Sequence, residues 1–419
     1  MTTLRNFSRF ITDTLRMITT GGPVYYLWVG FLLLLIAFGA NAYIGQIHNG
    51  LLVTNMRDQV SWGFYIGNFT FLVGVAAASI MLVIPAYIYD WEPIKEITIL
   101  GEMLAISALV MCLGFVMVDI GRPDRFWHIM PLVGRLNWPQ SMLAWDVLVL
   151  NAYLVLNYFV VTYLLYCAYT ERHYVKKLVT PLVLLSIPMA VSIHTCTAYL
   201  YNGLASRPFW NSAILAPRFL ASAFCSGPAI LLILLQILRK TTKLSIKDEA
   251  IFKIAELMAY TMGFNLFLTA AESFKELYSG TEHMVYFQYL LFGLKGHNTL
   301  VPYAWASIIF GAIAFILFLV PKTRTNWVTL NIGCVLIYAS VYIEKGMGLI
   351  IPGLTPDALG EIYVYTPSIT EISVAAGIFA LGFLVFTLML KAAVPMMLGE
   401  FTISRGRKGA QPAKSDGHA

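Results

Sequence analysis

Charged residues are scarce in this chain of 419 residues. Asp, Glu, Lys and Arg make up 12% of it, whereas soluble domains carry about 25%. The hydrophobic share is 58%, and apolar runs of roughly 18 or more residues recur, long enough to cross a bilayer as helices. Barrel strands are much shorter, and backbone groups in lipid must be hydrogen-bonded internally. The sequence therefore predicts an all-α polytopic membrane protein and excludes a soluble globule.

Cysteine and buried histidine are also rare. The five cysteines lie inside apolar runs and none is paired as C-x-x-C: Cys112, Cys167, Cys196, Cys225 and Cys334. This pattern argues against an iron–sulfur cluster or a metal site. Among the histidines, only His194 lies firmly inside an apolar run, whereas a membrane haem usually needs two facing histidines, so no haem is expected. Phosphate-binding loops are missing, and the net charge of +6 is spread over loops, so no nucleic acid is expected.

Ten apolar segments can span the membrane. They are residues 24–44, 61–89, 97–119, 141–169, 177–200, 213–238, 251–274, 300–320, 326–350 and 372–395. Residues 1–20 place several apolar side chains on one helical face, which predicts an amphipathic helix at the membrane surface rather than a signal peptide. Residues 21–398 form the membrane domain, and the polar residues 399–419 are expected to be a disordered cytoplasmic tail.

Lys and Arg are distributed unevenly over the connecting loops. Loops on the side of the N-terminus hold a large excess of them, for example Lys177, Lys240 and Lys322. Because positive residues concentrate on the cytoplasmic side of membrane proteins, both termini are predicted to be cytoplasmic. The longer opposite loops would then face the periplasm of a bacterial cell with this chain in its inner membrane.

A faint internal repeat suggests how the spans are grouped. Gly101–Ala105 in the third span resembles Ala255–Ala259 in the seventh. Ala144–Asp146 in the fourth likewise resembles Ala304–Ala306 in the eighth. Both copies start on the same side, so the repeat is parallel. We therefore expect two four-helix bundles, spans 2–5 and 6–9, with spans 1 and 10 flanking them.

Ionisable side chains within the spans gather toward the predicted outer face. Charge in lipid is costly and by default marks function, and a rise of 1.5 Å per residue places these groups at a similar depth: Asp119, Asp146, His194, Arg218, Glu272 and Glu344. Glu102 and Glu256 instead lie near the cytoplasmic side. Plain alternatives exist: Arg218 can extend to the interface, His194 can be a packing residue, and Glu102 can lie among headgroups. The shared depth favours one polar site.

The loop Val118–His128 follows the third span at this same depth. Its polar and aromatic residues include Asp119, Arg122, Asp124, Trp127 and His128. One interpretation is an ordinary solvated loop with interfacial anchors. The other is the mouth of a polar site cut into the membrane.

These residue types suit the binding of a quinone. Its reduction takes two electrons and two protons, so the pocket needs apolar walls, donors to the carbonyl oxygens and acids. The expected catalytic residues are Asp119, His194 and Arg218. The expected quinone-binding residues are Trp62, Arg122, Asp124, Trp127, His128, Trp145, Asp146 and Tyr199. A water-lined proton path would use Glu102, Glu256 and Glu272. Because no electron carrier is evident in the chain, a partner must deliver the electrons.

Several motifs resemble those of NrfD/PsrC-type membrane subunits. They are the loop Asp119–His128, the segment Trp138–Asp146, Ile193–Thr195 and the segment Pro217–Ala229. The resemblance is good over residues 60–240 and looser elsewhere. Ten spans are typical of the longer branch of this family, and the chain is most similar to membrane subunits of menaquinone reductase complexes of sulfate-reducing bacteria.

The resemblance implies a quinone-reactive subunit without a prosthetic group of its own, working in an anaerobic respiratory oxidoreductase with menaquinone. It also implies periplasmic partners: a ferredoxin-like iron–sulfur subunit, a molybdopterin-type subunit and a multihaem cytochrome c. Two alternatives stay open. A secondary transporter would usually place its site at the midplane between inverted repeats. A passive membrane anchor would leave the intramembrane His194, Arg218 and Glu256 unexplained.

Overall fold

The computed structural model describes every residue except 1, 96, 131–132 and 405–419. Ten segments of the described chain are long and apolar enough to cross a membrane, as the sequence predicted. These are α2 (Pro23–Asn49), continued by η1 (Gly50–Val53); α3 (Phe64–Ala76) with α4 (Ala78–Val83) and η2 (Ile84–Ile88); α6 (Thr98–Asp119); α7 (Met142–Tyr169); α8 (Lys176–Asn202); α9 (Leu215–Thr241); α10 (Asp248–Ser279); α12 (Val301–Leu319); α14 (Trp327–Lys345) with α15 (Met347–Leu354); and α16 (Ile369–Met397).

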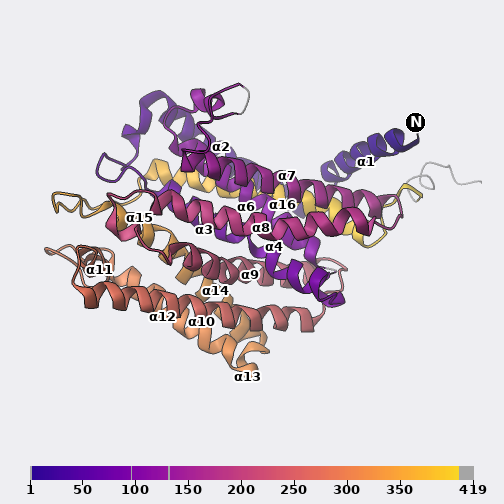
Figure 1. Cartoon of the computed structure of the whole chain (residues 1–419). Helices are drawn as coiled ribbons and strands as arrows, with labels where there is room; N and C mark the ends of the chain where they lie inside the picture. The colour runs from indigo at the N-terminus through magenta and orange to yellow at the C-terminus, as the bar shows by residue number, and fades with distance from the viewer. Residues whose placement is uncertain (1, 96, 131–132, 405–419) are drawn as a thin grey trace, which may run out of the picture.

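The spans form the two predicted bundles. The first bundle contains α3–α4, α6, α7 and α8, and the second contains α9, α10, α12 and α14–α15, each helix packing on its neighbours in sequence. Helix α9 joins them, because it also contacts α3, α4 and α8. Figure 1 shows the helices running roughly parallel, with α1 (Thr2–Thr19) at one end and α11 (Met284–Leu291) and α15 at the other. We call these the terminal end and the loop end.

The flanking helices α2 and α16 pack against each other and, through α16, against α6 and α7 of the first bundle. Their crossing depends on two glycines. A Cβ atom on Gly39 would lie 2.7 Å from the Cα atom of Gly377, closer than any real contact. Small residues allow such close approach, and dispersion forces drive helix association in lipid. The first and last spans are therefore fastened together.

Two tryptophans give the repeat a structural counterpart. Trp145 at the start of α7 donates from its indole N–H to the carbonyl of Pro139, at 3.0 Å. Trp305 at the start of α12 donates to the carbonyl of Leu291, at 2.9 Å. Each is on the third helix of its bundle, and each fastens that helix to the segment before it. The equivalent contacts support a parallel arrangement of the two bundles.

Local chemistry determines where two of the spans end. Helix α10 runs from Asp248 to Ser279, well past both predicted ends. Asp248 and Glu249 suit the positive N-terminal turn, and Gly280, with a φ of 60°, takes the left-handed conformation that ends helices. The second span ends in the π-helix η2, which contains Pro85. Proline lacks an N–H, and wide turns of this kind often lie at functional sites.

The N-terminal segment is helical as predicted. Phe10 is buried against Tyr166 and Tyr169 of α7, with ring centroids 5.5 Å apart in both pairs. Leu4 is exposed, so a role at the membrane surface stays a prediction. At the other terminus, Glu400 accepts from Lys243 at 2.8 Å and Thr402 is buried. The ordered chain thus extends past the expected tail boundary at 399. The disorder predicted for 405–419 falls outside the described residues.

Candidate functional site

One face of α8 forms the centre of a polar cluster in the first bundle. His194, Thr197 and Tyr201 are all fully buried, and their spacing of three and four residues puts them on the same side of the helix. Thr197 donates to Asp146 of α7 at 2.7 Å. The hydroxyl of Tyr201 shares a short hydrogen bond with that of Thr70 on α3. This face therefore joins three helices of the bundle through side-chain polar groups.

His194 is held so that one ring nitrogen stays open. Its Nδ1 atom lies 2.8 Å from the carbonyl oxygen of Ala190. Because a carbonyl can only accept, Nδ1 must carry the hydrogen, and the neutral ring then has its lone pair on Nε2. Nε2 is buried and has no hydrogen-bond partner among the residues that the structure describes. A buried polar atom left in this way is unusual, and it can receive a proton or a hydrogen bond from a ligand.

Two carboxylates accompany His194 in the loop-end half of the first bundle. Asp146 is buried and accepts a hydrogen bond from a neutral hydroxyl, that of Thr197. Asp119 is the last residue of α6, and its Oδ1 atom is buried without a partner in the described part of the chain. Gln46 of α2 donates to the backbone carbonyl of Val118 at 2.7 Å and so closes the end of α6. The predicted acids are thus present, and no described cation pairs with either.

Aromatic rings stand beside this polar face. The Tyr201 ring centroid lies 5.6 Å from that of Trp62 and 5.2 Å from that of Trp210. Trp62 thus lies beside the polar face, and its role as a wall of a quinone pocket stays a prediction. Tyr199 does not, because it is exposed on another face of α8. Trp145 packs on Trp138 with centroids 5.1 Å apart, above the start of α7.

The charged loop that follows α6 lies on the surface. Arg122 forms a two-point ion pair with Asp124, both contacts at 3.0 Å, with side chains 66% and 58% exposed. The guanidinium lowers the pKa of Asp124. Trp127 and His128 of η3 (Pro123–Ile129) are also exposed, with ring centroids 4.0 Å apart. The structure leaves these four residues outside the buried cluster. This placement agrees with the interpretation of the segment as a solvated loop.

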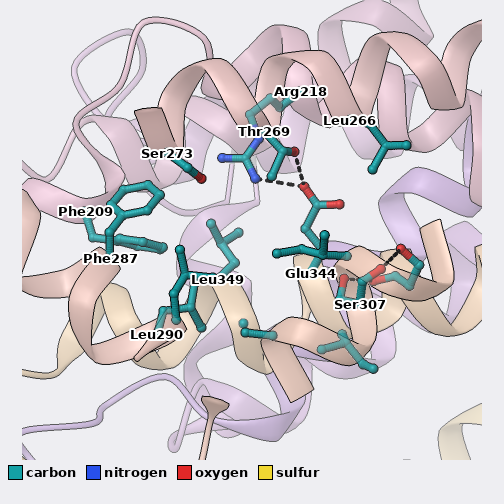
Figure 2. A pocket seen from close by; sticks show the side chains of 16 residues that line it. Phe209, Arg218, Leu266, Thr269, Ser273, Phe287, Leu290, Ser307, Glu344 and Leu349 are labelled. Carbon is teal, nitrogen blue, oxygen red and sulfur yellow. Dashed lines mark hydrogen bonds and ion pairs between the residues drawn. The ribbon is translucent and has the colours of Figure 1, made fainter. Parts of the chain in front are cut away.

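Arg218 belongs to a different group, in the second bundle. Its guanidinium forms ion pairs with Glu272 of α10 and with Glu344 of α14, the latter at 2.8 Å. Asn265 and Thr269 of α10 also donate to Glu344, each at 3.1 Å. Figure 2 shows Arg218 and Thr269 meeting Glu344 from one side of a cavity. Glu272, expected on a proton path, is instead a partner of Arg218.

The cavity beside this ion-pair cluster is small. Serine and threonine side chains line it together with Arg218 and Glu344, and Phe209, Phe287 and Leu290 close its other side (Figure 2). Its volume is about 70 Å³, enough for a few water molecules, whereas ligand pockets usually exceed about 300 Å³. In this conformation the cavity can hold water molecules but is too small for the ring of a quinone.

Lys345 is a buried cation that was not among the predicted site residues. It is 3% exposed, its Nζ donates to the carbonyl of Phe219 at 2.6 Å, and it lies 4.6 Å from the Phe219 ring centroid. Phe219 in turn packs on Tyr201, with centroids 6.0 Å apart. Lys345 and Phe219 thus connect the ion-pair cluster to the α8 face. The adjoining Glu344 and the long apolar run around them were the only signals in the sequence.

The two carboxylates at the terminal end have opposite surroundings. Glu102 on α6 is 3% exposed, and its Oε2 has no partner among the described residues. Glu256 on α10 has a side chain 25% exposed. It accepts from Lys253 at 3.3 Å and from Tyr260 at 3.1 Å, and it lies 3.7 Å from Arg324. Only Glu102 is therefore a buried acid of the predicted kind.

These features define an integral, multi-pass membrane protein with a buried polar site near one end of its first bundle. The family model described as "Polysulphide reductase, NrfD" matches residues 52–356, most of the chain. The chain belongs to the NrfD family, as its motifs predicted.

Three curated relatives match over most of their length. The chain is 24% identical over 396 residues to a putative dimethyl sulfoxide reductase membrane subunit of Halobacterium salinarum, covering 85% of this chain and 88% of the relative. It is 23% identical over 389 residues to a selenate reductase subunit of Mesobacillus selenatarsenatis, covering 83% and 88%. It is 26% identical over 385 residues to the Hdr-like menaquinol oxidoreductase integral membrane subunit of Archaeoglobus fulgidus, covering 88% and 92%.

Proposed function

We propose that this chain is the quinone-reactive membrane subunit of a respiratory oxidoreductase complex, with menaquinone as its substrate. The observation that carries the proposal is His194, fully buried in the membrane domain, with Nδ1 fixed by a carbonyl and Nε2 open. Two findings support the choice of quinone: the chain belongs to the NrfD family, and one relative is named as a menaquinol oxidoreductase subunit.

The first-bundle cluster supplies what the chemistry requires. Reduction of a quinone consumes two electrons and two protons and yields the quinol; oxidation of the quinol releases them. The neutral His194 ring accepts a hydrogen bond, and then a proton, from a quinol hydroxyl at Nε2; once protonated, it donates to a quinone oxygen. Asp146 and Asp119 can exchange protons with the site, and Trp62 with Tyr201 forms the aromatic wall. Among the described residues, no group of His, Cys, Asp and Glu could hold a metal ion.

Electrons must then come from partner subunits. We propose a ferredoxin-like iron–sulfur subunit next to the loop end, with a molybdopterin-type subunit and a multihaem cytochrome c beyond it in the periplasm. The exposed loop with Arg122, Asp124, Trp127 and His128 lies at this end, and suits a docking surface better than a quinone pocket. Both termini would then lie in the cytoplasm, where Lys and Arg are most abundant.

Arg218 has a positioning role in this proposal. Its ion pairs hold α9 against α10 and α14, and the next residue, Phe219, contacts both Tyr201 and Lys345. The cluster thereby places the start of α9 beside the His194 face. Arg218 is not required to touch the quinone.

Proton uptake from the cytoplasm would begin at Glu102. A buried carboxyl without a cation is best accommodated as the neutral acid, which holds a transferable proton. Glu102 and Asp119 are about 25 Å apart along α6 at 1.5 Å per residue, so a proton must pass through water and hydroxyl groups. Ser79 and Tyr153, hydrogen-bonded at 2.9 Å, provide hydroxyls between α4 and α7 in the first bundle.

The test is the binding of a fluorescent quinone analogue, 2-heptyl-4-hydroxyquinoline N-oxide, to the purified complex. His194→Gln should weaken binding by about tenfold or more, because a buried hydrogen bond is lost. It should also slow quinone-coupled turnover by about 10² to 10⁴, the usual contribution of a general acid–base group. His173→Gln, in an exposed loop, is the matched control.

Assembly of each variant is checked by size-exclusion chromatography. An assembled His194→Gln complex that binds the analogue and turns over like wild type would remove His194 from the site. A wild-type complex that never binds the analogue would favour the passive anchor.

A further inference from the structure

A long apolar slot opens between the two bundles in the terminal-end half of the molecule. Its walls come from α4 and η2 of the first bundle and from α9 and α10 of the second. Its lining includes Met81, Pro85, Trp91, Phe224 and Leu257, and its volume is about 430 Å³. That is within the range of ligand pockets and several times larger than the cavity beside Arg218. Nothing in the quinone chemistry above uses it.

The dimensions of the slot match one lipid leaflet. It extends along α10 from Lys253 to Thr261, which is about 12 Å at 1.5 Å per residue. The hydrocarbon of one leaflet is about 15 Å thick, half of the 30 Å core. Tyr89 and Tyr260 at its sides are exposed, as expected of aromatic residues near the membrane interface. The slot therefore has the depth of an acyl chain that enters from the terminal-end surface.

The two hydroxyl groups that α10 contributes to the slot are already engaged. Thr261 donates to backbone carbonyls of its own helix and of Phe224, at 3.2 and 3.3 Å. The Tyr260 hydroxyl donates to Glu256. A quinone head inside the slot would need donors for two carbonyl oxygens, and neither α10 hydroxyl is available for this. The third hydroxyl, that of Tyr89, belongs to an exposed residue at the edge of the slot. An apolar chain needs no donor.

The α10 side of the slot's mouth carries positive charge. Lys253 lines it with a half-exposed side chain, and Arg324 of α13 (Pro321–Arg324) stands on the far side of Glu256. Two cations around one carboxylate leave one positive charge in excess. Across the slot, Lys95 pairs with both Asp90 and Glu92, which leaves one negative charge in excess there. The two sides together are neutral, and only the α10 side attracts a phosphate. A phosphate at this level would meet Lys253.

We propose that the slot is a binding site for a phospholipid, with one acyl chain between the bundles and the phosphate at Lys253. The lipid fills the gap that the wide turn of η2 leaves between α4 and α10, and so joins the two bundles at the terminal end. This lipid site is separate from the quinone site. The lipid proposal does not depend on whether the chain binds quinone.

The experiment counts the phospholipids that the detergent-washed complex retains, by native mass spectrometry and by extraction. Leu257→Trp fills the slot and should release one tightly held phospholipid per copy of this chain. Lys253→Gln should weaken retention of phosphatidylglycerol without filling the slot. Phe264→Trp, exposed to lipid on the same helix, and Lys247→Gln, an exposed lysine before it, are the matched controls and should retain the lipid.

Thermal unfolding with added dioleoyl-phosphatidylglycerol gives a second readout. The lipid should raise the Tm of wild type and of both controls, and should do so less for Leu257→Trp and Lys253→Gln. If Leu257→Trp does not assemble, Lys253→Gln decides alone. Loss of menaquinone instead of phospholipid from the slot variants would overturn the proposal, as would equal phospholipid retention in all variants.

Discussion

The buried carboxyl groups of the two bundles have opposite surroundings. In the second bundle, Glu272 and Glu344 share the guanidinium of Arg218. In the first, Asp119 and Asp146 have no cation partner among the described residues. Both sets lie in the loop-end half of the molecule. The buried charges of the second bundle are paired in a network, whereas the described acids of the first bundle have no cation beside them.

The same contrast recurs at the terminal end, at matched positions of the repeat. Glu102 and Glu256 each stand on the second helix of their bundle. Glu256 is held by Lys253, Tyr260 and Arg324, while Glu102 is buried with an open oxygen. A carboxylate kept charged by cations is a poor proton carrier, and a buried one without a cation is a good one. We therefore propose proton chemistry for the first bundle and structural support for the second.

The largest expected effect comes from breaking the network. Arg218→Gln leaves Glu272 and Glu344 buried without their cation, and losing one partner of a buried ion pair typically costs about 3–5 kcal/mol. We expect a large drop in the amount of assembled complex and in its Tm. The Glu272→Gln and Glu344→Gln changes, added to Arg218→Gln, should restore part of it. Lys243→Gln, which breaks an exposed pair with Glu400, is the control and should have no measurable effect.

The next prediction separates the two terminal-end carboxylates. Glu102→Gln keeps the shape of the side chain and removes its proton, so turnover in liposomes should build little or no membrane potential. Glu256→Gln should leave the potential at the wild-type value, because its carboxylate is held in ion pairs. A voltage-sensitive dye reports both, with quinone turnover measured in parallel. Equal potentials in the two variants at equal turnover would erase the contrast between the bundles.

Hydropathy was sufficient to predict the fold. The ten spans and their grouping into two bundles follow from apolar run lengths and a faint repeat, because lipid permits few alternatives. The predicted ends of the helices were less accurate where capping residues, and not the apolar run, determine where a helix stops. Asp248 and Gly280 lengthen α10 beyond its apolar stretch, and residues around Thr402 are ordered by contacts that no local pattern predicts.

The site was predicted only in part, because the sequence of one segment does not show which residues of a distant segment its side chains will contact. His194 and Asp146 were correctly expected to be buried, as their position in apolar runs suggested. That Arg218 pairs with Glu272 and Glu344 depends on how three helices pack. Lys345 lies inside the predicted ninth span, but its own segment does not indicate what it contacts, because its partner Phe219 belongs to α9.

The smallest expected effect concerns Arg122 and Asp124, an Arg–carboxylate pair in which both side chains are exposed. Arg122 and Asp124 have the same chemistry as the Arg218 network but lie in water, where such pairs contribute little.

Because Arg122 lowers the pKa of Asp124, any contribution of the pair is present above the ordinary Asp value of about 4 and fades only as the pH falls below it. Quinone turnover of Asp124→Asn should therefore stay within about fivefold of wild type, with a constant ratio between pH 5 and pH 8. Turnover of the assembled complex with excess quinone, measured across that range, gives this ratio. A loss as large as that expected for His194→Gln, or a ratio that changes near neutral pH, would show that the loop folds into the quinone site when the partners dock. The loop would then be solvated only in the free chain and would form part of the quinone site in the assembled complex.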